Sequence, residues 1–148
     1  MTILSATGDL LDVNVWLALA VTGHPHHKTA LQSWSTLRRP AFCRITHLSL
    51  LRLLTNKEVM GKDALGPEEA WKSYETLLAA GAARFIAEPD GIEASLKDAA
   101  KGAKAARDFW TDTYLAAFAR TAGLRLVSFD TGFARLSDLD CLILKPND

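Results

Sequence analysis

The sequence predicts an α/β fold, a three-layer α/β/α sandwich with a short, mainly parallel central sheet. Short apolar runs typical of buried strands alternate along the chain with stretches whose apolar residues recur every three or four positions, as in helices. The chain has 148 residues, of which 49% are hydrophobic and 23% are charged. This length and composition suit one domain over residues 1–148 with its own core, and they exclude a disordered polypeptide.

The first elements are a strand followed by two helices. The run DLLDV over 9–13 is typical of a strand and leads directly into a helix that begins near Asn14. The segment HPHH at 24–27 interrupts this helix, because proline removes a backbone donor and fixes its own backbone angle. Helical periodicity resumes over 28–37 and ends before Pro40.

The middle of the chain repeats the alternation of strand and helix. Residues 41–44 are the second strand candidate, and Thr46 opens a strongly apolar helix. Pro67 and the two glutamates after it are typical of a helix start, because acidic residues favour the positive end of the helix dipole; this helix should extend to about residue 80. Residues 84–87 are a third strand candidate, and a helix is expected over 90–102.

The last third of the chain carries the clearest pattern. An amphipathic helix is expected over 108–122, with aromatic residues on adjoining faces and Gly123 as its C-cap. The run LRLVSF over 124–129 is typical of a buried strand, and residues 141–144 are expected to form the final one.

Several classes of protein are excluded by the chain ends and the cysteines. The N-terminal region is apolar but has no Lys or Arg before Lys28, unlike a secretory signal, and no apolar run approaches the roughly 20 residues of a membrane span. Cys43 and Cys141 lack the close spacing of a zinc or redox pair. They are therefore expected to be buried, reduced thiols in a cytoplasmic protein.

The charge balance excludes a generic polybasic nucleic-acid binder. Lys plus Arg and Asp plus Glu both number 17, so the formal net charge is zero. Two stretches, 38–62 and 97–107, are nevertheless predominantly basic. Such stretches are usually solvated helix faces, but they would contact RNA phosphates if they bordered a functional crevice.

Three aspartates are candidates for a shared site. Asp12 and Asp130 each follow a strand candidate, and ligands of open α/β sheets bind beyond the carboxyl ends of the strands. Asp112 lies early in the helix that precedes the LRLVSF strand. Three converging carboxylates repel one another unless a cation such as Mg²⁺ or Mn²⁺ neutralises them, and such a cation serves phosphoryl chemistry. An aspartate at such a junction is also a common helix cap, and spacing alone leaves both interpretations open.

Four segments in their order along the chain carry a resemblance to a known family: LLDVNVWLAL, ITHLSLLRLLTN, TDTYLAAFA and LRLVSFDTGF. Together they resemble the PIN domain, and most of all the VapC-type toxins of bacterial toxin–antitoxin pairs. The resemblance spans nearly the whole chain. It implies a Mg²⁺- or Mn²⁺-dependent endoribonuclease that cuts structured RNA such as tRNA or rRNA, is commonly dimeric, and is inhibited by a cognate VapB-like antitoxin.

The resemblance assigns roles to individual residues. Asp12, Asp112 and Asp130 match the acids that hold the metal and carry catalysis. Asn14 matches the polar residue that supports the first acid, and Ser128 matches a small hydroxyl residue expected to donate or accept hydrogen bonds in the crevice.

Two positions depart from the family pattern. Ser49 stands where the family usually has a glutamate, and Gly132 stands where it often has a further acid. Asp108, one turn before Asp112, is either an extra ligand or a helix cap. The departures motivate an alternative, a catalytically degenerate PIN module that binds RNA or a protein partner without cleavage. A third hypothesis is a small phosphohydrolase that acts on free phosphate esters with the same carboxylates.

Other residues are candidates for contact with RNA. The basic stretches and the helix expected to line the site supply five of them: Arg44, His47, Arg52, Lys104 and Arg107. The three histidines of the HPHH segment are expected to pack a loop or contact RNA. The four tryptophans are expected to pack in the core or in a dimer, and to stack on bases only where one is exposed.

Overall fold

A single parallel sheet organises the computed structural model, which describes residues 7–79 and 83–146. Its strands have the order β3-β2-β1-β4-β5, and every pair is parallel. The strands are β1 (Asp9–Leu11), β2 (Ala41–Phe42), β3 (Arg84–Phe85), β4 (Arg125–Ser128) and β5 (Cys141–Ile143). The central strand β1 pairs through Leu10 with Ala41 of β2 and with Leu126 of β4. The predicted α/β class with a parallel central sheet is confirmed.

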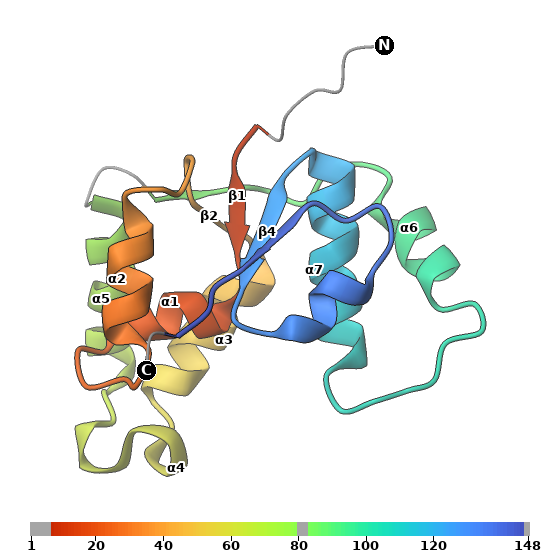
Figure 1. Cartoon of the computed structure of the whole chain (residues 1–148). Helices are drawn as coiled ribbons and strands as arrows, with labels where there is room; N and C mark the ends of the chain where they lie inside the picture. The colour runs from red at the N-terminus through yellow and green to blue at the C-terminus, as the bar shows by residue number, and fades with distance from the viewer. Residues whose placement is uncertain (1–6, 80–82, 147–148) are drawn as a thin grey trace.

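Helices cover both faces of this sheet. In the described part of the chain they are α1 (Val13–Ala20), α2 (His27–Trp34), α3 (Arg44–Leu54), α4 (Lys57–Met60), α5 (Pro67–Ala79), α6 (Ile92–Ala99) and α7 (Phe109–Ala122), with 3₁₀ turns η1 (Gly61–Asp63) and η2 (Thr131–Arg135). Figure 1 shows α1, α2 and α5 on one side of the sheet and α6 and α7 on the other. This is the three-layer α/β/α arrangement that the sequence predicts.

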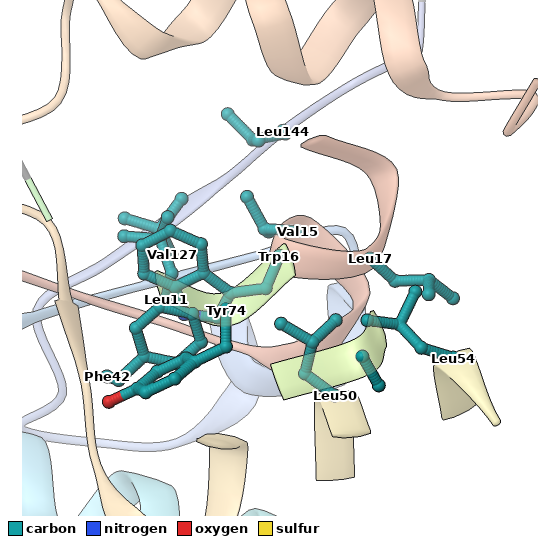
Figure 2. Packing of buried hydrophobic residues seen from close by; sticks show 11 residues of the cluster. Leu11, Val15, Trp16, Leu17, Phe42, Leu50, Leu54, Tyr74, Val127 and Leu144 are labelled. Carbon is teal, nitrogen blue, oxygen red and sulfur yellow. The ribbon is translucent and has the colours of Figure 1, made fainter. Parts of the chain in front are cut away.

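The core on the α1 side is built around stacked aromatic rings. Trp16 of α1 stacks on Phe42 of β2 with ring centroids 3.8 Å apart, and Phe42 meets the edge of Tyr74 of α5 at 4.9 Å. Leu50 and Leu54 of α3 belong to the same cluster, and Figure 2 shows Leu54 beside Leu17 of α1. Offset and edge-on ring pairs add to the free energy of burial, so this cluster fixes α1, α3 and α5 against the sheet.

The core on the other side depends on small residues. Ala116, Ala117 and Ala119 of α7 are almost fully buried, and Phe118 of the same helix is completely buried. Alanines let the helix axis approach the sheet closely, and Gly123 ends the helix with a positive φ of 69°. The predicted C-cap at Gly123 is confirmed. The C-terminal half of α7 is therefore packed against the sheet, while its first turn carries Asp112.

Some boundaries differ from the prediction for local reasons. Helix α3 begins at Arg44 rather than Thr46, because the Thr46 hydroxyl accepts a hydrogen bond from the backbone N–H of Cys43 at 3.0 Å and caps the helix two residues earlier. Helix α6 is shorter than the predicted 90–102. The predicted end of α5 at residue 80 lies outside the described residues. Cys43 is buried as expected, whereas Cys141, which opens the edge strand β5, is only half-buried; both thiols are free.

No helix within residues 7–79 and 83–146 is both long enough and apolar enough to cross a membrane.

Candidate active site at the carboxyl ends of β1 and β4

Asp12 lies between strand β1 and helix α1 and is only 7% exposed. One carboxylate oxygen, Oδ1, accepts a hydrogen bond from the backbone N–H of Val13 at 2.7 Å. The other, Oδ2, accepts one from the Ser128 hydroxyl of β4 at 2.8 Å. Asp12 therefore caps helix α1 through one carboxylate oxygen and is tied to the neighbouring strand through the other.

Ser128 joins the ends of the two central strands. Its hydroxyl oxygen accepts hydrogen bonds from the Asn14 side-chain amide at 3.3 Å and from the backbone N–H of Asp130 at 2.9 Å. The Asn14 side-chain oxygen in turn accepts a hydrogen bond from the backbone N–H of Phe129 at 3.3 Å. A hydroxyl has one proton and two lone pairs, and all three are used here. Asn14 and Ser128 therefore fix the orientation of Asp12.

Asp130 begins the 3₁₀ turn η2 and has an exposed side chain. Its Oδ1 accepts a hydrogen bond from the backbone N–H of Gly132 at 2.8 Å. A Cβ atom at position 132 would lie 3.1 Å from this Oδ1, which is closer than ordinary van der Waals contact. A side chain at position 132 would therefore require the Asp130 carboxylate to shift by a few tenths of an ångström, which glycine avoids.

Asp112 projects from the first turn of α7 and is half-buried. Burial, followed by the negative charges of Asp12, Asp130 and Asp108, raises its pKa to about 6. Burial also raises the pKa of Asp12, whereas the hydrogen bonds from Ser128 and Val13 lower it. The charges of Asp130 and Asp108 raise it further. The carboxylates thus act on one another electrostatically, as the sequence predicts for three of them.

Asp108 occupies the N-cap position of α7, but its side chain makes no capping hydrogen bond. The interpretation of Asp108 as a capping side chain is therefore wrong. Its carboxylate instead lines the same cavity as Asp112 and Asp130 and raises the pKa of Asp112. The site holds four acids within electrostatic range of one another.

This set of donors fits a hard divalent cation. All four groups are carboxylates, and their mutual repulsion is what a bound cation would relieve. Within residues 7–79 and 83–146, no three His, Cys, Asp or Glu side chains are close enough to ligate one ion directly as they stand. Mg²⁺ keeps several water ligands and often binds through only one or two carboxylates, so a cation here would be held partly through water.

A cavity of about 390 Å³ opens beside the carboxylates. Its walls include Asp108, Asp112 and Asp130 together with Arg107, Phe109 and Leu136. Acidic, basic and apolar groups therefore meet in one cavity. The contribution of Phe109 and Leu136 did not follow from the sequence, where both resemble ordinary core residues.

The basic candidates fall into two groups. Lys104 and Arg107 lie in the exposed segment that leads into α7, and Arg107 lines the cavity. Arg44 and Arg52 are exposed on α3. Among the residues of the basic stretch 38–62, Arg38 lies at the opposite edge of the sheet, where its carbonyl accepts a hydrogen bond from the N–H of Asp9 at 2.8 Å. This part of the stretch does not border the site.

The position of His47 differs from the prediction. Its side chain is only 1% exposed and packs against Tyr74 and Trp71 of α5, with ring centroids 4.0 and 5.1 Å away. Its Nδ1 lies 3.0 Å from Arg44 Nη1. The expected contact of His47 with RNA is wrong for this structure, because the turn of α3 places the ring against α5. Of the HPHH histidines, His26 stacks on Phe129 and packs the loop onto the sheet end.

Comparison with known proteins identifies the family. The PIN domain matches residues 10–139 of the chain. The chain belongs to the PIN domain family. This PIN domain is 42% identical over 144 residues to Ribonuclease VapC41 of Mycobacterium tuberculosis, covering 91% of the chain and 97% of that relative. Its identity to Ribonuclease VapC38 of the same species is 34% over 131 residues, covering 86% and 89%. The predicted resemblance to VapC-type proteins is confirmed.

Solved structures show the same fold. A toxin–antitoxin complex from Klebsiella pneumoniae matches this PIN domain with a TM-score of 0.64 at 16% identity, covering 94% of the chain and 99% of that chain.

The repulsion in the PIN site predicts a gain in stability when one charge is removed. The raised pKa of Asp112 means that the folded state binds its proton more tightly than the unfolded state, whose pKa is near 3.8. Ionisation of Asp112 therefore lowers the free energy of unfolding: the protein has its full stability below pH 4 and loses part of it as the pH rises to 6 and above. Asp112→Asn should therefore stabilise the metal-free protein at pH 7.5 by about 1–2 kcal/mol, after allowance for partial solvent screening.

Urea unfolding in EDTA at pH 4 and pH 7.5 would measure this effect. The exposed Asp98 of α6 provides the control, since Asp98→Asn removes a charge paired only with Lys101 at the surface. An equal effect of Asp112→Asn at both pH values would contradict ionisation as the cause.

Proposed function

We propose that this PIN domain is a VapC-type toxin, an endoribonuclease that hydrolyses RNA phosphodiester bonds with a divalent cation, Mg²⁺ or Mn²⁺. The observation that carries the proposal is the group of carboxylates after β1, after β4 and at the start of α7, in which burial and the charges of the other acids raise the pKa of Asp112 to about 6. Two relatives more than 30% identical are named ribonucleases, which supports RNA as the substrate.

Each residue has a defined task in the proposed site. Asp12, Asp112 and Asp130 would hold the cation, directly or through water. The bound cation would polarise the phosphate and lower the pKa of the attacking water. Asn14 and Ser128 hold the Asp12 carboxylate in one orientation through the hydrogen bonds described above, and this reduces the reorganisation needed when substrate binds.

Basic residues near the site would bind the RNA backbone. Arg107 lines the cavity that contains Asp112 and Asp130, and Lys104 lies three residues before it in the same exposed segment. Arg44 and Arg52 on α3 are further candidates. A net charge of zero is compatible with RNA binding here, because the attraction for phosphate comes from the positive groups beside the acids and not from the total charge.

The proposal includes the partners of VapC-type proteins. The fold is shared with a chain of a toxin–antitoxin complex from Klebsiella pneumoniae, which supports a VapB-like antitoxin that would inhibit this chain in the cytoplasm. A homodimer and a structured substrate such as tRNA or rRNA belong to the same proposal.

Cleavage of purified tRNA and rRNA with Mn²⁺, and with EDTA in its place, tests the function. Metal-dependent internal cuts are expected. Binding of RNA without cleavage under all conditions would favour the degenerate module that Ser49 and Gly132 suggest. Turnover of a phosphate monoester with RNA left intact would favour a small phosphohydrolase.

Phosphate contact by Arg107 predicts a specific change in salt dependence. Arg107→Gln should weaken binding of any RNA by a similar factor and reduce the slope of log K against log salt by about 1, because one fewer counterion is released. Binding in EDTA over a range of KCl concentrations would measure it. Arg39→Gln is the matched control, since Arg39 lies beside Arg84 at the other edge of the sheet. An unchanged slope for Arg107→Gln would remove Arg107 from the interface.

A further inference from the structure

Two adjacent aromatic residues, Phe109 and Trp110, begin helix α7, and Phe109 lines the cavity of the proposed site. Trp110, in the first turn of α7, is 62% exposed, the largest exposed fraction among the large hydrophobic residues of the described chain. Its ring meets the ring of Phe109 edge-on, with centroids 5.0 Å apart and planes at 81°. Phe109 in turn lines the cavity beside Asp112. Single exposed hydrophobic residues are common on protein surfaces, so the exposure of Trp110 gains meaning only from the cavity and the charged groups next to Phe109.

The surroundings of these rings indicate which occupant. The cavity of about 390 Å³ lies within the range of roughly 300–1,000 Å³ typical of small-ligand pockets, and Phe109, Phe133 and Leu136 supply an apolar part of its wall. The segment that precedes helix α7 is exposed and carries Lys104 and Arg107. Aromatic rings next to cationic side chains are the arrangement that binds single-stranded nucleic acid, through base stacking and phosphate contacts respectively.

We infer that Phe109 and Trp110 form a stacking platform for unpaired RNA bases next to the bond that is cut. One base enters the cavity against Phe109, and a neighbouring base stacks on the exposed face of Trp110. Arg107 contacts the phosphate between them, and the scissile phosphate lies at the carboxylates. The platform rests on the proposed function and extends it, because it selects single-stranded segments of a structured RNA and excludes paired ones.

Binding of short RNAs in EDTA tests the platform without cleavage. The probes are a fluorescein-labelled decamer of adenosine and a decamer of abasic ribose phosphate, which has the same charge and no bases. Trp110→Ala and Phe109→Ala should each weaken binding of the adenosine decamer by about 5- to 150-fold, the range found for loss of one stacked base. Both variants should bind the abasic decamer as the natural chain does.

Two further variants control for loss of structure. Trp71 of α5 is also exposed, at 45%, and packs on His47, so Trp71→Ala removes a comparable ring away from the cavity and should leave RNA affinity unchanged. Trp110→Phe keeps an aromatic face and should restore part of the affinity. Unchanged affinity in Trp110→Ala, or equal losses on both decamers, would overturn the inference.

The remaining outcomes distinguish failure of the stacking platform from failure of the proposed function. A second copy of the chain covering Trp110 would show as a change of sedimentation in Trp110→Ala without a change in RNA affinity, and this would overturn the platform. Binding that depends on Trp110 in a protein that cuts no RNA would overturn the proposed function alone. Intact cleavage with an unchanged KM in Trp110→Ala would overturn the platform alone.

Discussion

Asp12→Asn is expected to lower RNA cleavage by about 100- to 1,000-fold while the protein stays folded. Asp12 is the most buried of the four acids and the one held from two directions, by Ser128 and by the backbone of Val13. Asparagine has nearly the same shape and keeps an oxygen for the Val13 N–H, but it carries no charge to hold a cation. Metal-assisted charge stabilisation is worth several kcal/mol, and 1.36 kcal/mol corresponds to a tenfold change in rate.

Single-turnover cleavage at saturating Mn²⁺ would measure the loss, with thermal unfolding as the check on folding. Asp98→Asn repeats the same chemical change on an exposed acid of α6 and should keep full activity. Raising the Mn²⁺ concentration should restore part of the activity of Asp12→Asn if the defect lies in metal affinity. If Asp12→Asn cut RNA as fast as the natural chain, the proposed mechanism would be refuted.

The positions of Asp12 and Asp130 could be predicted because they depend on a simple rule. Each follows an apolar run, and the carboxyl ends of neighbouring parallel strands meet at one edge of the sheet. The role of Ser128 was implied by the family resemblance, and the pairing of β1 with β4 explains how its hydroxyl reaches Asp12. Local sequence also favoured caps at these positions, and the structure shows capping hydrogen bonds from Val13 to Asp12 and from Gly132 to Asp130.

Other features depend on contacts that the sequence does not specify. His47 and Ser49 lie two residues apart on one apolar helix, and only the packing of α5 decides that His47 is enclosed by rings. Asp108 has the residue type and position of a cap, yet its side chain makes no capping hydrogen bond and its charge raises the pKa of Asp112. Tertiary packing overrides the local preference in both cases.

The role of Asp9, at the other end of strand β1, also depends on contacts that the local sequence does not reveal. It resembles Asp12 in sequence, an acid flanking two leucines, but it lies at the N-terminal end of the strand and is completely buried. Both of its oxygens bind Arg125 of β4, at 2.8 and 2.9 Å, and Oδ2 also accepts the backbone N–H of Arg38 at 2.7 Å. Its partners are fixed by strand pairing across 116 positions, which no local pattern reveals.

Asp9→Ala should therefore destabilise the fold by about 3–5 kcal/mol, because it leaves the guanidinium of Arg125 partly buried without its counterion and the Arg38 N–H without its acceptor. Arg125→Ala should cost at least as much, since the carboxylate it leaves unpaired has no exposure to water. Urea unfolding at pH 7 would give both values.

The double replacement Asp9→Leu with Arg125→Met decides whether the cost comes from the unpaired charge. Replacing a buried ion pair by apolar residues of similar volume is often neutral or stabilising, so the double variant should recover much of the stability that either alanine variant loses. It should also cut RNA normally, because the pair lies at the opposite end of β1 from Asp12. A double variant as unstable as Asp9→Ala would mean that the geometry of the pair aligns β1 with β4, and cleavage should then fall as well, since the Asp12 to Ser128 hydrogen bond depends on that alignment.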